Sequence, residues 1–196
     1  MTKRTWIFGN DYMQCLDHQH GASSVDIPSA QLPDAKVVAT RKRLRESVGN
    51  AEALEAMREI VSNLLGCETM CLLQLDRKGR VPWLFWSFGI DFGKHRMISA
   101  LQEPVLSCIA LGSTHIVRDL KAQGLKENFA KVSVFVPIRS NDQIVAVLAL
   151  LQFLPQKQEI DDVDMKVFQV LSEEAGSALF GSNADAVPTI RQKHHD

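Results

Sequence analysis

The stretch VSVFVPIRSNDQIVAVLALLQF, residues 132–153, decides the fold of this chain. Two runs rich in Val, Ile, Leu and Phe flank the short polar segment 139–143, a pattern that predicts a β-hairpin. Pro137 lacks a backbone donor and favours an edge position or the end of the first strand. The second arm, 144–151, is apolar without interruption, so it is expected to be covered on both faces by other layers of structure.

The composition is that of an ordinary soluble domain. The 196 residues suit a single core, and the formal net charge of −1 gives no general attraction to nucleic acid or to anionic lipid. No apolar run reaches the roughly 18 residues that span a bilayer, and the N-terminus becomes polar too soon for a signal peptide. We therefore expect a cytoplasmic protein with neither nucleic acid nor membrane as a partner.

Apolar periodicity and turn signals divide the rest of the chain. Residues 1–33 are rich in Gly, Ser and Pro and are expected to form an irregular arm, and residues 182–196 are expected to be a disordered tail. Between them we predict one domain, 34–181, with its core in 51–181. Helices are predicted at 34–48, 51–65, 97–111 and 162–181, the third divided at Pro104, and further strands at 69–75, 80–88 and 115–120.

Four segments in this order resemble the GAF domain family over roughly 51–181. They are LLGCETMCLLQLDRKGRVPWLF, EPVLSCIALGSTHIVRDL, FVPIRSNDQIVAVLAL and DDVDMKVFQVLSEEAGSAL. The resemblance implies an α+β fold, a GAF/PAS-like antiparallel sheet of about five or six strands with helices packed on both faces. That architecture agrees with a strand at 144–151 that is buried on both sides.

The resemblance also implies a place for a small molecule, between one face of the sheet and a cover made of the loop 91–96 and the helix 97–111. Strands that contain Ala149 and several of the candidate residues would form the wall of this site. The cationic side chains would suit an anionic ligand. A solvated loop face also explains these cationic side chains. The candidate ligand-binding residues are Phe85, Lys94, His95, Arg96, Cys108, His115, Val117, Arg118 and Phe135. No cofactor can be named from these residues.

Other ligand classes within the family find less support. Phytochrome-like members attach a bilin through a Cys beside a His, whereas Ile109 follows Cys108 here. The cyclic-nucleotide signature lacks its spaced acidic residues. Arg139 and Asp142 match an Arg-x-x-Asp pattern of some cyclic-dinucleotide sites, but a solvated hairpin turn explains the same residues.

An enzyme and a metal site are two further alternatives. One branch of the family reduces free methionine sulfoxide with several lid cysteines, and here Cys108 alone lies in that segment. The spacing of four places Cys67 and Cys71 on one face of a strand, too far apart for a disulfide. Cys15 lies among Asp and His residues in the segment 15–20, but no second ligand pair follows at zinc-finger spacing. We expect no catalytic residue and no metal.

The function predicted from the sequence is a non-catalytic sensory or regulatory domain that binds a small molecule, a partner protein, or both. A ligand-free dimerisation or interaction module is the alternative, and a methionine sulfoxide reductase-like enzyme is a third reading. The helices 34–48, 51–65 and 162–181 could pair two copies in a homodimer. The basic cluster 41–45 fits a solvated helix face or contact with an acidic partner.

Overall fold

The computed structural model describes residues 34–76, 82–90, 96–118, 120, 132–157 and 159–181, and side chains are described for all of these except 96–100. The predicted arm 1–33 and tail 182–196 lie outside the described residues. The described strands form one antiparallel sheet in the order β2-β1-β5-β4-β3. These strands are β1 (Cys67–Leu75), β2 (Pro82–Phe88), β3 (His115–Arg118), β4 (Val132–Ser140) and β5 (Gln143–Phe153).

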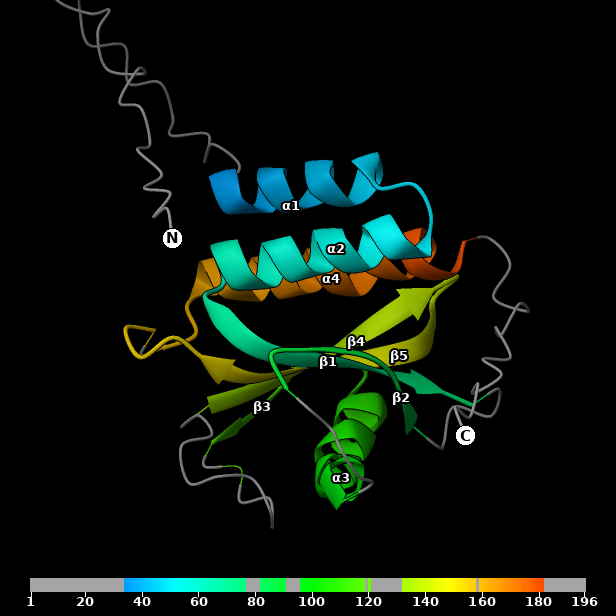
Figure 1. Ribbon diagram of the computed structural model, residues 1–196, viewed down its shortest axis with the longest axis vertical. Helices are drawn as coiled ribbons and strands as arrows, with labels where there is room; N and C mark the ends of the chain where they lie inside the picture. Colours follow the sequence, from blue (N-terminus) through cyan, green and yellow to red (C-terminus); the bar gives the residue numbers. More distant parts are fainter. Residues whose placement is uncertain are drawn as a thin grey trace, which may run out of the picture. The chain divides into compact units, whose positions relative to one another are not determined.

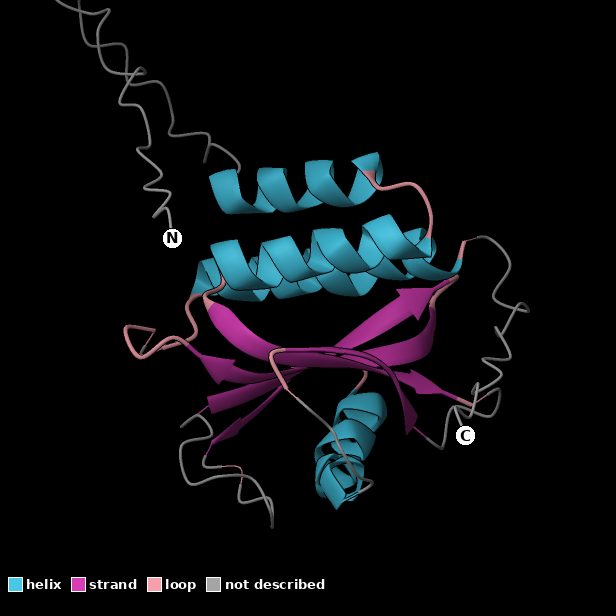
Figure 2. Ribbon diagram, in the orientation of Figure 1, coloured by secondary structure: helices cyan, strands magenta, loops and turns pink. Residues whose placement is uncertain are grey.

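Helices cover both faces of this sheet (Figures 1 and 2). α2 and α4 lie against one face, α1 lies on their outer side, and α3 lies against the opposite face. The helical elements are α1 (Ala35–Glu46), α2 (Asn50–Glu59), the π-helical segment η1 (Ile60–Leu64), α3 (Arg96–Leu111) and α4 (Asp162–Phe180). The prediction of an α+β fold with helices on both faces is confirmed. None of the helices in the described part of the chain is long and apolar enough to cross a membrane.

The central strand β5 is buried on both faces, as its uninterrupted apolar run predicted. Leu148 and Leu150 belong to the core beneath α2 and α4, whereas Val147 and Ala149 belong to the core beneath α3. All four side chains are inaccessible to solvent. The strand therefore separates two apolar cores and holds them at a fixed spacing.

The hairpin of β4 and β5 closes through a two-residue turn. Asn141 and Asp142 have φ of 49° and 63°, the left-handed conformations that a tight hairpin turn requires and that Asn and Asp tolerate. Pro137 pairs with Val147 of β5, and β3 ends before it reaches Pro137. The missing donor of this Pro is thus tolerated in an interior strand, because no described strand flanks β4 on its other side there.

Two details of the helices differ from expectation. α3 continues through Pro104, which was expected to begin a separate helical segment. A proline inside a helix costs one backbone hydrogen bond, and here the burial of Leu101, Val105 and Cys108 on one face of the helix holds the two halves together. The helix after Gly49 changes to π-helical geometry at Ile60, where periodicity alone predicted a uniform helix.

α4 begins and packs as its sequence indicates. Asp161 accepts a hydrogen bond from the backbone N–H of Asp164 at 2.8 Å, and the Asp164 carboxylate accepts one from the N–H of Asp161 at 3.0 Å, forming a capping box. One turn from its other end, Gly176 faces the β4–β5 hairpin. A Cβ atom at this position would lie 1.9 Å from the carbonyl oxygen of Arg139, so the helix rests directly on the strand backbone.

We expect Gly176→Ala to lower the free energy of unfolding by about 2 kcal/mol, because the added methyl group forces α4 away from β4, at a cost larger than the gain of about 1 kcal/mol from helix propensity. Urea denaturation measures the change. Ser177→Ala, at the next and exposed position of the same helix, is the matched control and is expected to change stability by less than about 0.5 kcal/mol. Equal stabilities of the two variants would contradict the close contact.

Candidate functional site

The face of the sheet beneath α3 is where the family resemblance places a ligand. One row of paired residues crosses all five strands on this face: His115, Phe135, Ala149, Cys71 and Ser87. Directly paired residues of antiparallel strands point to the same side of a sheet. Two of the candidate residues, His115 and Phe135, are thus neighbours on the predicted face.

The described side chains between α3 and this row form a buried apolar cluster. Phe135 is inaccessible to solvent, and so are Val105 and Cys108 of α3. The side chains at the edge of this cluster are less completely buried. Val117, Ile109 and His115 are each half-buried. The fully buried members of the cluster are Cys71, Leu73, Leu75, Leu101, Val105, Cys108, Phe135, Val147, Ala149 and Leu151.

Cys108 is held between α3 and β4. Its Sγ lies 3.4 Å from the carbonyl oxygen of Phe135 and 3.6 Å from that of Ser113, so the thiol hydrogen has an acceptor within reach. Burial raises the pKa of this thiol from its ordinary value of 9.0 to about 12. Cys108 is therefore a protonated, hydrogen-bonded core residue at neutral pH.

Two candidate residues lie on the opposite face, so placing them at this site was wrong. Phe85 packs with the core beneath α2 and α4, its ring centroid 5.9 Å from that of Phe180. A bulge makes it an extra residue of β2, because Leu72 pairs with Trp86 while the adjacent Leu73 pairs with Leu84. The irregularity turns Phe85 away from α3.

Arg118 is the second such residue. It pairs with Val132, which packs against the core of the α2 and α4 side, so alternation along β3 points Arg118 away from Val117 and His115. Its side chain is exposed. Lys94 and His95 lie outside the described residues, and Arg96 begins α3 without a described side chain.

The cysteines of β1 also differ from expectation. Cys67 belongs to the core beneath α2 and Cys71 to the core beneath α3, whereas their spacing predicted a common face. The pairing of β1 with β5 shifts between Cys67 and Met70, and this irregularity reverses the side. Burial raises the pKa of Cys67 to about 11 and that of Cys71 to about 12.

Arg139, part of the Arg-x-x-Asp pattern of some cyclic-dinucleotide sites, bonds to the protein itself. Its guanidinium donates to the carbonyl oxygen of Gly112 at 2.6 Å and to that of Asp142 at 3.1 Å. Gly112 follows the last residue of α3, so the arginine ties the hairpin turn to the end of this helix. The reading of residues 139–142 as a hairpin turn accounts for these contacts.

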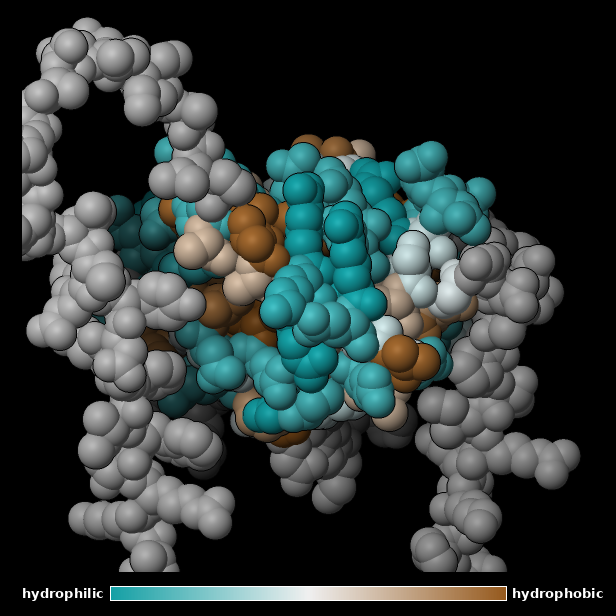
Figure 3. Space-filling model, turned by 90° about the horizontal axis from the view of Figure 1, so that it is seen from above, coloured by the Kyte–Doolittle hydropathy of each residue, from teal (hydrophilic) through white to brown (hydrophobic). Residues whose placement is uncertain are grey.

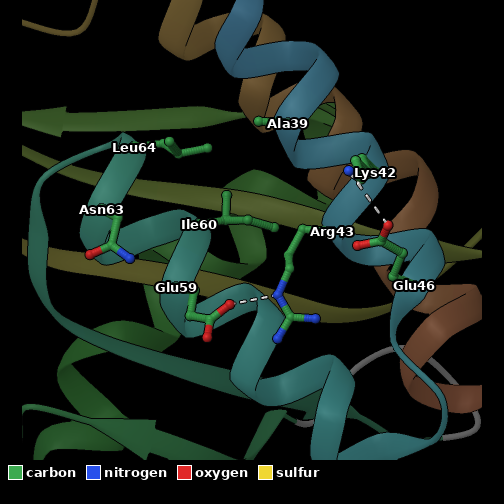
Figure 4. A pocket seen from close by; sticks show the side chains of 8 residues that line it. All are labelled: Ala39, Lys42, Arg43, Glu46, Glu59, Ile60, Asn63 and Leu64. Atoms are coloured by element: carbon green, nitrogen blue, oxygen red, sulfur yellow. Dashed lines mark hydrogen bonds and ion pairs between the residues drawn. The ribbon is translucent and has the colours of Figure 1, made fainter. Parts of the chain in front are cut away.

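Sequence reasoning missed a second region, the surroundings of α1. Two hollows flank this helix, one of about 280 Å³ against α2 and η1 and one of about 410 Å³ against α4. Figure 4 shows the first, with Ile60 and Leu64 beneath Ala39 and with Arg43 reaching across to Glu59. The run of basic residues at 41–45 was the sequence feature that could have indicated this region. Its acidic partners, however, are distant in sequence.

No group of three or more His, Cys, Asp or Glu residues in the described ranges is arranged to hold a metal ion. The cluster around Cys15 considered for metal binding lies outside those ranges.

A protein-family model for the GAF domain matches residues 50–179, well over half of the chain. The chain belongs to the GAF domain family. The match begins at the first residue of α2, so α1 lies before the part that the model covers. A comparison with curated proteins found no match.

Several solved structures share the fold at low sequence identity. The GAF domain of an Acinetobacter phosphoenolpyruvate-protein phosphotransferase is 12% identical with a TM-score of 0.55, covering 76% of this chain and 94% of that one. Residues 122 to 287 of a methyl-accepting chemotaxis protein are 15% identical at 0.51, covering 76% and 99%. Free methionine-R-sulfoxide reductase of Neisseria meningitidis is 15% identical at 0.50, covering 74% and 87%. These likenesses concern the fold alone.

In a Cys15→Ser variant, we expect the remaining three thiols to be nearly inert toward an aromatic disulfide reagent at about pH 8, because each is buried and protonated. Absorbance of the released thiolate measures the reaction. Addition of denaturant should release about three equivalents, which provides the control. Rapid reaction of one thiol in the folded protein would contradict this burial.

The raised pKa values also predict a loss of stability in base. Below about pH 9 the thiols are protonated in both states, whereas above it the unfolded chain ionises and the folded chain does not, so the free energy of unfolding falls as the pH rises toward 11 and 12. Urea denaturation across this range measures the slope. Cys108→Ala is expected to flatten it relative to the parent protein, and an unchanged slope would argue against the contribution of this thiol.

Proposed function

We propose that this chain is a non-catalytic regulatory GAF module whose output is a contact with another protein and which works without a small molecule beneath α3. The observation that supports this most directly is the burial of the described side chains on that face. Phe135, Cys108, Val105 and Leu101, which come from β4 and α3, are at most 1% exposed. A ligand at their position would have to displace packed side chains.

The thiols support the non-catalytic part of the proposal. Reduction of a sulfoxide needs a thiolate nucleophile with a second thiol in reach. Cys71, Cys108 and Cys67 all have raised pKa values, and Cys67 lies on the other side of the sheet from the first two. The described cysteines therefore serve as small buried side chains rather than as a redox pair.

A small molecule at the margin of the α3 face is the second candidate. His115, Val117 and Ile109 are half-buried there, and the segments 91–95 and 121–131, which adjoin this face in sequence, lie outside the described residues. Arg118 faces the other way, and Arg139 donates to two carbonyl oxygens. The described part of the margin thus favours a neutral, mainly apolar molecule over the anionic ligand expected from the sequence.

Homodimerisation through the terminal helices and a cytoplasmic location remain predictions that belong to this proposal. α1, α2 and α4 pack against one another within one chain, and the only large apolar side chains strongly exposed on α1 and α4 are Val38 and Met165. A dimer through these helices would therefore be mainly polar, and a polar interface of this kind is typical of transient contacts.

Native mass spectrometry of the full chain, purified gently from cells, tests the proposal. The expected result is the bare protein mass, alone or with protein subunits. A bound small molecule would overturn the ligand-free proposal in favour of the second candidate. In that case His115→Ala should lower the occupancy by about tenfold while Arg118→Ala, on the opposite face, should not change it.

A further inference from the structure

α1 is attached to the domain by a small buried contact and by several ion pairs. Only Leu44 and Thr40 of this helix are fully buried, and Val37 packs partly against the core. These three residues lie at i, i+3 and i+7, which makes one narrow buried stripe of two apolar residues and a threonine whose hydroxyl donates to the carbonyl of Lys36. Figure 3 shows the helical layer from above, with hydrophilic side chains across its middle and smaller apolar areas beside them.

Cations on both flanks of the stripe pair with acids of α2 and α4. Arg43 bonds to Glu59 at 2.5 Å on the α2 side. Arg41 and Arg45 both bond to Glu174 on the α4 side, at 3.0 and 3.1 Å. Ion pairs that water can reach contribute little each and weaken with salt, so this attachment is readily reversible.

Asp164 adds an incompletely satisfied acid at the far end of the same surface. Its side chain is fully buried, and its Oδ2 accepts from Lys157 and from the N–H of Asp161. Its Oδ1 has no hydrogen bond, and Lys36 of α1 approaches it only to 3.7 Å. A buried carboxylate oxygen without a donor is costly, so a better placed cation would be favoured there.

The packing beside α1 is also incomplete. The two hollows that flank the helix run along its contacts with η1 and with α4, where Ile60, Leu64 and Ala178 form apolar parts of their walls. The connection to α2 is short, with Val48 81% exposed and Gly49 at φ 85° in open space. α1 thus occupies its site without filling it.

From these observations we propose that the surface of α2, η1 and α4 beneath α1 is a docking groove for a basic amphipathic helix of a partner protein, and that α1 is its built-in competitor. Charge complementarity defines the partner. It carries apolar residues at i and i+7 with a small residue such as Thr at i+3, and basic residues on both flanks to meet Glu59, Glu174 and Asp164. This inference rests on the proposed function, since it names the surface through which that function would act.

The competition has a quantitative consequence. A tethered helix acts at a high effective concentration, so α1 excludes an equal helix added in trans until the tethered contact is weakened. Weakening the cations of α1 leaves the groove intact and should open it. The probe for the groove is a fluorescent peptide of residues 34–48, whose fit is that of α1 itself.

Fluorescence anisotropy at low salt tests the proposal with full-length protein. The variant R41Q/R43Q/R45Q is expected to bind the peptide at least about tenfold more tightly than the parent chain, and added salt should weaken this binding. Adding Glu174→Gln should abolish most of the gain, whereas Glu103→Gln, an exposed residue of α3 on the other side of the sheet, should not. Equal weak binding by the parent chain and the variant, or indifference to Glu174→Gln, would overturn the proposal.

Two further measurements keep the test decisive. If the triple variant is unfolded by circular dichroism, insertion of about six Gly and Ser residues after Val48 loosens the tether instead and should give the same gain. If light scattering shows a dimer of the variant that the peptide dissociates, the occupant is α1 of a second copy, which would overturn the assignment to a partner protein. A small molecule found by native mass spectrometry would overturn the ligand-free function while the peptide result still stands.

Discussion

The burial of β5 on both faces is the constraint on which the rest of the structure depends. A strand that hides apolar side chains above and below needs two covering layers, and it receives α2 with α4 on one side and α3 on the other. The two covers are unequal. In the described part of the chain, the first cover has two packed helices, while the second has one helix whose cluster ends in half-buried residues such as Val117 and Ile109.

Much of this fold could be predicted because its signals are local. The alternation of apolar residues identified the hairpin, and Asp161 with Asp164 marked the start of α4. The face on which each site residue lies was harder to predict, because local signals alone do not determine it. An extra residue at Phe85 and two successive shifts in the β1–β5 pairing near Cys67 have no distinctive sequence, and each irregularity reverses the face that the alternation assigns. Arg118 was misplaced for a simpler reason. Val117 and Arg118 are adjacent in β3, and adjacent residues of a strand face opposite sides of the sheet.

The role of the basic residues of α1 depends on partners that the local pattern does not contain. Arg45 and its partner Glu174 are separated by 129 positions in the chain. Without that pairing, a run of Arg and Lys on one helix is most simply read as a solvated face. Only the fold shows that these cations lie over the acids of α2 and α4. It also shows that α1 covers part of the surface formed by α2, η1 and α4.

At the end of the β4–β5 hairpin, one residue, Arg139, contacts the helical layers on both faces of the sheet. The guanidinium of Arg139 bonds to the carbonyl of Gly112 just after α3, and its own carbonyl oxygen lies against Gly176 of α4. The strand backbone itself lies against α4 at Gly176, whereas α3 is held there through the Arg139 side chain. α1 has no such anchor in the described structure, since it is held by a narrow buried stripe and by ion pairs that water can reach. The element most easily exchanged is therefore the one that lies outside the region shared with the GAF family model.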